Sequence, residues 1–144
     1  ARDAGISAAT AHRYLDALSV SFQVFCVPAF AINRSKRLIK APKVYWTDTG
    51  LAAHLAGFPS PEELAASREW GMWLENWVLV QLSIYSAARV PALSVSHYRT
   101  ASGIEVDFVI EAPRRLLPIE VKTTRQPKAD HLAGSGSTLS ISLV

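Results

Sequence analysis

The sequence has 144 residues, of which 49% are hydrophobic and 19% are charged. This is enough chain for about one domain, or for two small units, with a buried core, and the composition is not that of a disordered tail. We find no run of eighteen apolar residues, and no basic N-terminal region followed by an apolar stretch. We therefore expect neither a membrane span nor a secretory signal. A single cysteine, Cys26, excludes an internal disulfide and suits a cytoplasmic protein.

The two ends of the sequence indicate a piece of a longer protein. The chain begins at Ala1, without methionine, inside what reads as a helical motif. It ends on the apolar run 139–144, directly after the glycine- and serine-rich residues 134–137. We therefore expect truncation at both ends.

Charge is distributed unevenly along the sequence. Residues 1–47 carry seven basic and two acidic side chains, whereas residues 48–144 carry eight basic and ten acidic ones. No acid occurs between Asp16 and Asp48, and five basic residues crowd into 34–43. This asymmetry favours a polyanionic partner such as nucleic acid, although a solvated basic loop is the simpler alternative.

The first third of the sequence has the element order of a winged helix. Gly5 can end one helix, and Ser7 can cap a second that runs to about Leu18. A strand over 22–27, a basic turn and a strand over 43–47 follow. A short glycine-containing turn between two helices is typical of a helix-turn-helix, and the basic turn would be the wing.

Several residues of this segment are candidate nucleic-acid contacts. Small or hydrogen-bonding side chains near the start of the second helix could approach a major groove, and the basic wing could contact phosphates. The candidates are Thr10, His12, Arg13, Arg34, Lys36, Arg37, Lys40 and Lys43. Winged helices also serve as protein–protein adaptors, so an adaptor or interdomain role stays open.

The middle of the sequence contains breaks and then a long helix. Asp48 or Thr49 can cap a helix, the run 57–61 breaks the chain, and Pro61 opens another helix. We place a domain boundary near 58–60. The helix predicted over 68–88 has a wide apolar surface beside Glu75, whose carboxylate needs a partner unless it reaches solvent at the edge.

Two strands then carry acids where a buried strand would have none. On the strand 105–110, Asp107 points to the face opposite Phe108, and on the strand 116–124, Glu120 and Lys122 share one face. If these strands are adjacent, the three side chains can converge. Converging carboxylates repel each other unless a divalent cation lies between them, and Mg²⁺ prefers such oxygen ligands. The alternative is that Lys122 only pairs with Glu120 or Asp107 at a strand edge. His54, His97 and His131 lack metal-ligand spacing and are expected at the surface or in caps.

These residues carry a family resemblance. A glutamate on a helix, then an aspartate, then Glu-x-Lys on successive strands resembles the PD-(D/E)XK nuclease superfamily. The segments "TAHRYLDAL", "KRLIKAPKVYWTDTGLAAHLAG", "GMWLENWV", "YRTASGIEVDFVIE" and "LPIEVKTT" together resemble the C-terminal part of bacterial and archaeal ATP-binding proteins that end in domain of unknown function 4143. The resemblance covers roughly residues 1–130, and it implies a P-loop ATPase domain before the winged helix. No G-x-x-x-x-G-K-[ST] occurs here, so we expect no ATP site in this chain.

Together these observations predict an α/β (α+β) chain in two parts. Residues 1–58 would form an N-terminally truncated winged helix, and residues 59–144 a PD-(D/E)XK nuclease-like mixed sheet flanked by helices and truncated at its C-terminal end. The resemblance implies a Mg²⁺- or Mn²⁺-dependent phosphodiesterase-type site, with Asp107 and Glu120 as metal ligands and Lys122 and Glu75 as catalytic residues. DNA and the absent ATPase domain would be partners. The alternative is a non-catalytic DNA- or protein-binding module that serves the ATPase domain, or a scaffold for that domain without nucleic acid.

Overall fold

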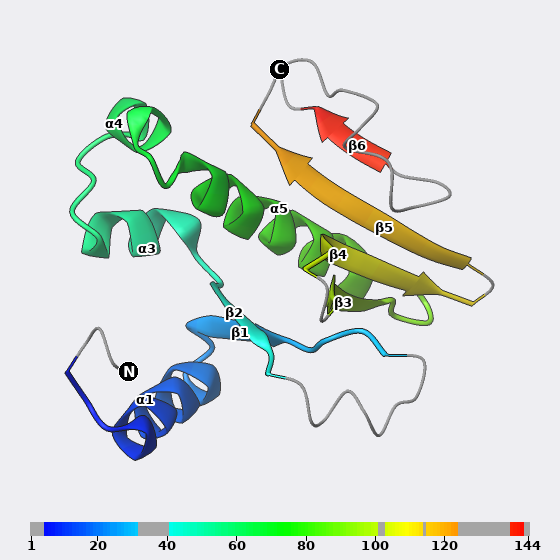
Figure 1. The fold of residues 1–144 in the computed structure, drawn as a ribbon, viewed down its shortest axis with the longest axis horizontal. Helices are drawn as coiled ribbons and strands as arrows, with labels where there is room; N and C mark the ends of the chain where they lie inside the picture. The colour runs from blue at the N-terminus through cyan, green and yellow to red at the C-terminus, as the bar shows by residue number, and fades with distance from the viewer. Residues whose placement is uncertain (1–4, 32–40, 101–102, 114, 124–138, 143–144) are drawn as a thin grey trace.

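The computed structural model describes residues 5–31, 41–100, 103–113, 115–123 and 139–142. In chain order the elements are α1 (Ala8–Val20), β1 (Val24–Val27), β2 (Lys43–Trp46), α3 (Thr49–Leu55), α4 (Pro61–Ala66), α5 (Trp70–Ala87), β3 (Ser94–Arg99), β4 (Glu105–Ala112), β5 (Arg115–Lys122) and β6 (Leu139–Ser142). This confirms the predicted mixed α and β content. Figure 1 shows α5 running along the larger sheet, with α3 and α4 on its other side.

Helix α1 begins and ends with capping motifs that the sequence supplies. The Ser7 hydroxyl accepts a hydrogen bond of 3.1 Å from the backbone N–H of Thr10. At the other end the N–H of Gln23 bonds to the carbonyl of Leu18, and the N–H of Phe22 bonds to that of Ser19. This is a Schellman motif, in which the residue in the left-handed region is usually glycine but is here Phe22, with φ of 58°. The strand predicted from residue 22 therefore starts only at Val24.

A two-stranded antiparallel sheet connects α1 to the rest of the molecule. β1 pairs with β2 in a register that places Val24 opposite Trp46 and Val27 opposite Lys43. Helix α1 packs against β1. The order helix, strand, strand agrees with the sequence expectation, while the intervening residues 32–40 lie outside the described part of the chain.

The larger sheet has the strand order β3-β4-β5-β6. β3, β4 and β5 are antiparallel neighbours, and β6 pairs with β5 in parallel. The sheet is therefore mixed, as predicted. A bulge interrupts the β3–β4 register between Ser96 and Tyr98.

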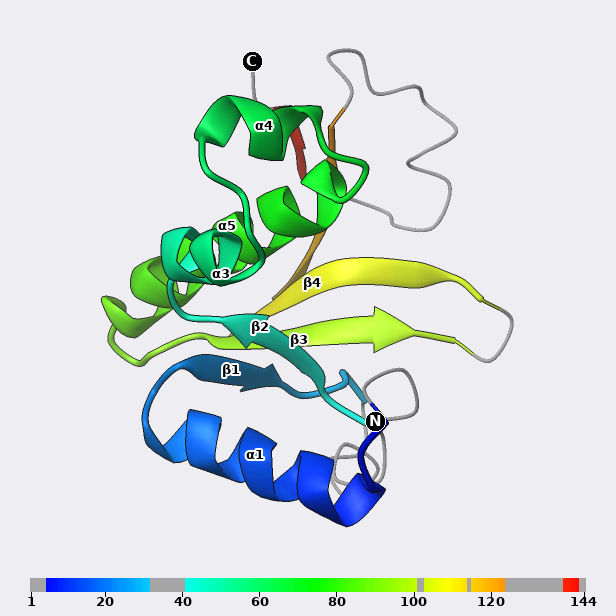
Figure 2. The ribbon, with the colours of Figure 1, turned by 90° about the vertical axis from the view of Figure 1, so that its left-hand side faces the viewer.

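The two sheets meet at β1 and β3. Figure 2 shows these strands side by side, and an isolated parallel bridge joins Ala29 to His97. The N–H of Phe30 bonds to the carbonyl of His97, and the N–H of His97 bonds to that of Pro28 at 3.0 Å. His97 is only 6% exposed, so the expectation of a surface or cap position is wrong for this residue, because the joint between the sheets covers it.

One buried cluster fills the space between α5 and the sheets. Its members are Val27, Tyr45, Leu74, Val78, Leu79, Phe108, Ile110 and Ile119. Phe108 is fully buried, and its ring centroid lies 5.7 Å from that of Tyr45. Residues from both sides of position 58 thus contribute to the same core. Among the described residues, no helix is both long and apolar enough to cross a membrane.

Candidate functional site

Asp107 lies where the hydrogen-bonded ladder between β4 and β5 stops. The ladder runs from the pair Ala112–Arg115 to the pair Phe108–Ile119. One residue further on, the Asp107 carboxylate accepts a hydrogen bond of 2.8 Å from the backbone N–H of Val121. A side chain thus replaces the backbone partner at this point, and Asp107 is held at the open end of the strand pair.

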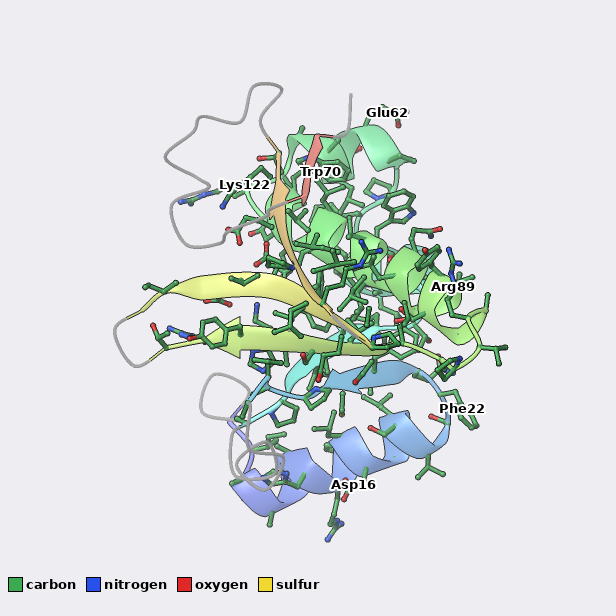
Figure 3. All side chains as sticks on the ribbon, turned by 90° about the vertical axis from the view of Figure 1, so that its right-hand side faces the viewer. Asp16, Phe22, Glu62, Trp70, Arg89 and Lys122 are labelled. Atoms are coloured by element: carbon green, nitrogen blue, oxygen red, sulfur yellow. The ribbon has the colours of Figure 1, made fainter. Side chains whose placement is uncertain are left out.

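Glu120 and Lys122 lie on the neighbouring strand, as predicted. Their positions two residues apart on β5 place both on one face of the sheet. The Lys122 ammonium donates to the Glu120 carboxylate at 2.6 Å, and the side chains are 36% and 23% exposed. This hydrogen bond raises the pKa of Lys122 above its ordinary value. Figure 3 shows Lys122 at the end of β5.

Glu75 reaches the site from α5 and is held by two residues of β2. Its Oε1 atom accepts hydrogen bonds from the Tyr45 hydroxyl and, at 3.2 Å, from the Lys43 ammonium. Burial, together with the hydrogen bond to Glu75, raises the pKa of Tyr45 far above its ordinary value, so the hydroxyl stays a donor. Of the two alternatives for Glu75, a partner or an exposed edge position, the structure shows partners and a half-buried side chain.

Asn76 fixes the distance between α5 and β2. Its side-chain carbonyl accepts from the N–H of Trp46 at 2.8 Å, and its amide donates to the carbonyl of Trp46 and to the Thr49 hydroxyl, both at 3.0 Å. Asn76 is 5% exposed. Because it follows Glu75 directly, these bonds also fix the part of α5 from which Glu75 extends.

Lys43 bridges two carboxylates of the site. Its ammonium lies 3.2 Å from Glu75 and 2.6 Å from Glu105 on β4. Burial pulls the pKa of Lys43 down, but the hydrogen bond to Glu105 and the charge of Glu75 outweigh it, and the pKa is raised. The same hydrogen bond lowers the pKa of Glu105. Lys43 therefore stays charged and is committed to this cluster.

Asp107 experiences the negative charge of its neighbours. Burial, and after it the charges of Glu75 and Glu120, raise the pKa of Asp107 to about 6. The hydrogen bond from Val121 and the charge of Lys43 act in the opposite direction but do not outweigh them. Asp107 on β4 therefore experiences the charge of one carboxylate on α5 and one on β5. We call Glu75, Glu105, Asp107 and Glu120, with Lys43 and Lys122, the acidic cluster.

The donor set of the acidic cluster has the chemistry that a hard divalent cation needs. Mg²⁺ is commonly held by one or two carboxylates together with water and substrate phosphate oxygens. Asp107 and Glu120 can supply such carboxylates, and the raised pKa of Asp107 marks a place where added positive charge would be favourable. Within the described ranges, no three His, Cys, Asp or Glu side chains lie close enough to hold a metal ion together. The carboxylates are instead turned toward Lys43, Tyr45, Lys122 and the Val121 N–H.

The candidate nucleic-acid residues fall into three groups. His12 and Arg13 are exposed on α1, and the Thr10 hydroxyl is hydrogen-bonded to that of Ser7 at 2.9 Å. Lys43, expected in the basic wing, lies instead in the acidic cluster. The remaining candidates, Arg34, Lys36, Arg37 and Lys40, lie outside the described residues.

Three residues of the site were missed by reasoning from sequence. Glu105 carried a detectable signal, since it is two residues before Asp107 and therefore on the same face of β4. Tyr45 and Asn76 carried none, because their roles depend on how β2 packs against α5. Only the structure shows that Tyr45 and Lys43 approach Glu75 together.

Comparisons with known families cover both halves of the chain. Residues 70–140 match the family model described as Domain of unknown function (DUF4143). This confirms, for that segment, the resemblance that the sequence motifs indicate. Residues 1–62 match a second model, Domain of unknown function (DUF8612). The acidic cluster draws Lys43 from the first segment and its other residues from the second.

Two curated relatives are similar over most of this chain. Uncharacterised proteins of Mycobacterium bovis and Mycobacterium tuberculosis are each 33% identical to it over 127 residues, which is 88% of this chain. The chain spans 28% of the length of either relative. No solved structure matches significantly.

Proposed function

We propose that the acidic cluster is a divalent-cation-dependent phosphodiester hydrolysis site of the PD-(D/E)XK type, in a DNA-associated module. The observation that carries this proposal is the position of Asp107, half-buried at the open end of the β4–β5 ladder and facing the charges of Glu75 and Glu120. Burying one carboxylate near two others costs free energy in a purely structural role. A cation that binds between them would remove this cost.

Each residue has a role that its position supports. Asp107 and Glu120, from adjacent strands, would hold the cation, which would acidify a water and neutralise charge on the scissile phosphate. Lys122, whose charge is ensured by its raised pKa, would orient the attacking water or stabilise the developing negative charge. Glu75, held by Tyr45, would support the site from α5.

DNA contact is proposed through the exposed residues of α1. His12 and Arg13 lie on the solvent side of the helix that the winged-helix interpretation places at a major groove. Together with the basic residues of 32–40, they would contribute phosphate contacts, whose strength falls steeply with salt.

The first test is a calorimetric titration of Mn²⁺ into this chain and into an Asp107→Asn variant. Asparagine keeps an oxygen acceptor for the Val121 N–H, so the variant should fold. We expect binding by the wild-type chain and at least a tenfold loss in the variant, which corresponds to about 1.4 kcal/mol. Cleavage of DNA that is abolished by Lys122→Ala would then establish hydrolysis. A folded chain that binds no Mn²⁺ would overturn the proposal, unless the Lys43 variant described below binds it.

A second candidate function is a non-catalytic binding module that serves a separate ATPase domain in a longer protein. The observation that favours it is that Lys43 and Lys122 already neutralise carboxylates of the cluster. Here the acidic cluster would only join β2, α5 and the larger sheet. DNA binding that weakens with salt, without any effect of Mn²⁺ and without cleavage, would favour this module. Salt-insensitive binding of an ATPase domain would favour the protein-partner version.

A further inference from the structure

We propose that Lys43 is a built-in counter-ion of the acidic cluster, and that a divalent cation binds there in exchange for the Lys43 ammonium. This inference rests on the proposed cation site. It assigns to Lys43 a regulatory role at that site, beside the phosphate contact expected from its sequence position.

The geometry of Lys43 is that of a bridging cation. Its ammonium lies between a carboxylate of α5, Glu75 at 3.2 Å, and a carboxylate of β4, Glu105 at 2.6 Å. Its side chain is 27% exposed, so the pairs are only partly screened by water. A single ammonium therefore fixes two acids that come from different elements.

The position of Lys43 is set by β2. Lys43 pairs with Val27 across the small sheet, and Tyr45, two residues on, points to the same side and donates to Glu75. Asn76 ties the same strand to α5 through both backbone groups of Trp46. Because the strand is held this firmly, the end of the flexible Lys43 side chain is the part that can move.

Lys43 would compete for Glu75, the supporting carboxylate from α5, with a cation that is held by Asp107 and Glu120. The Glu75 Oε1 atom already accepts from both Lys43 and Tyr45, which leaves it little capacity for a third partner. An ammonium about 3 Å from that oxygen would also repel a cation bound to it. A cation that binds Oε1 of Glu75 would therefore displace Lys43, and a cation that binds the other oxygen would be repelled by the nearby ammonium.

A released Lys43 side chain has space beside the cluster. A pocket of about 310 Å³ lies between β2 and α5, and Lys43, Trp46, Met72, Trp73, Glu75 and Asn76 are among its lining residues. An ammonium that swings into this open pocket would be hydrated and available to an anionic group such as a phosphate. Cation binding would thereby convert Lys43 from an internal partner into a contact for substrate.

The test compares Mn²⁺ affinity in the wild-type chain, Lys43→Met and Arg99→Met. Methionine keeps the length of the side chain but removes the charge. Arg99→Met is the matched control, because Arg99 lies 3.8 Å from Glu105, is 67% exposed and does not pair with Glu75 in the structure. We expect Lys43→Met to bind Mn²⁺ about tenfold more tightly, equivalent to about 1.4 kcal/mol, and Arg99→Met to change much less.

The outcomes separate this inference from the proposed function. One supporting outcome is that Lys43→Met binds Mn²⁺, the wild-type chain does not, and the double variant with Asp107→Asn loses binding again. This would show that Lys43 blocks the site. Equal or weaker binding in Lys43→Met than in the wild type overturns the inference and leaves the cation site standing. Equal tightening by Arg99→Met also overturns it, because the effect would then be one of net charge. No binding by either folded chain overturns both.

A second measurement needs no variant. Labelling of lysine amines by a small acylating reagent, followed by peptide mass spectrometry, reports how available each ammonium is. With Mn²⁺ at a concentration that saturates the wild-type chain, labelling of Lys43 should rise several-fold. Unchanged or reduced labelling of Lys43 under these conditions would overturn the exchange, even if Lys43→Met failed to fold.

Discussion

The carboxylate of Asp107 on β4, one residue beyond the last paired residue Phe108, accepts a hydrogen bond from the backbone N–H of Val121 on β5. The bond joins a titratable side chain to the backbone of the strand that carries Glu120 and Lys122. The protonation state of Asp107 is therefore coupled to the structure of the open end of the sheet.

Substituting Asp107 by asparagine should change how stability depends on pH. The pKa of Asp107 is raised to about 6 in the folded chain, so between about pH 4 and pH 6 the folded state holds more protons than the unfolded state. The contribution of Asp107 to the free energy of unfolding therefore falls as pH rises through this window. Asparagine mimics the protonated form, so Asp107→Asn should gain stability relative to wild type up to about pH 6 and then hold that gain.

Urea denaturation at several pH values from 4 to 8 would measure this difference. Glu62→Gln, an exposed acid on α4, controls for the loss of one negative charge. A difference between Asp107→Asn and wild type that is constant over this range would contradict the raised pKa.

Replacing Asn76 by alanine should be strongly destabilising. The substitution removes three hydrogen bonds and leaves the N–H and carbonyl of Trp46 without their side-chain partners. Because the site is buried, the cost should be roughly 2–4 kcal/mol in the free energy of unfolding. Chemical denaturation would measure it, with Gln81→Ala as a control that removes an exposed amide from the same helix. A cost equal to that of the control would mean that α5 and β2 are not tied in this way.

The Lys43–Glu105 pair should show measurable coupling, and the Arg99–Glu105 pair should not. Both pairs share one carboxylate, but the first is 2.6 Å long and partly buried, whereas the second is 3.8 Å long with an exposed arginine. A double-mutant cycle with Lys43→Met and Glu105→Gln should give about 0.5–1 kcal/mol, and the Arg99→Met cycle close to zero. Equal coupling in the two cycles would argue against a special position of Lys43.

Glycine at position 22 should stabilise the chain. Phe22 is 82% exposed and has φ of 58°, a conformation that costs a non-glycine residue free energy. Phe22→Gly relieves this strain, which raises the free energy of unfolding. The greater freedom of the unfolded glycine chain offsets part of this, so we expect a net increase of about 0.5–1 kcal/mol in the free energy of unfolding. Thermal unfolding would show a higher Tm, and Phe22→Ala, which keeps the strain, should not. A lower Tm for the glycine variant would show that the Phe22 ring stabilises the fold through packing.

Local sequence signals predicted the elements well, because they depend on near neighbours. Ser7 and Asp48, both expected as caps, each accept a hydrogen bond at the start of a helix. Alternation along β4 and β5 placed Asp107, Glu120 and Lys122 correctly on their strands. The start of β1 was predicted two residues early, because a Schellman motif closed by phenylalanine has no recognisable glycine.

Contacts between distant elements could not be predicted in the same way. Lys43 belongs to a basic run, and its charge pattern indicated a wing that contacts phosphate. Its ammonium instead lies near acids that follow it by 32 and 62 positions, and no local pattern records such a distance. The role of Tyr45 depends on the same packing of β2 against α5.

The shared core has a consequence for how this protein can be divided. Family boundaries at 62 and 70 invite expression of the second segment alone, but Val27 and Tyr45 from the first segment fill the core beneath Phe108. Without the first segment, Glu75 would lose Lys43 and Tyr45, and part of the apolar side of α5 would meet water. The segments 1–62 and 70–140 therefore share one core, and we expect the second segment, expressed alone, to expose that core to solvent.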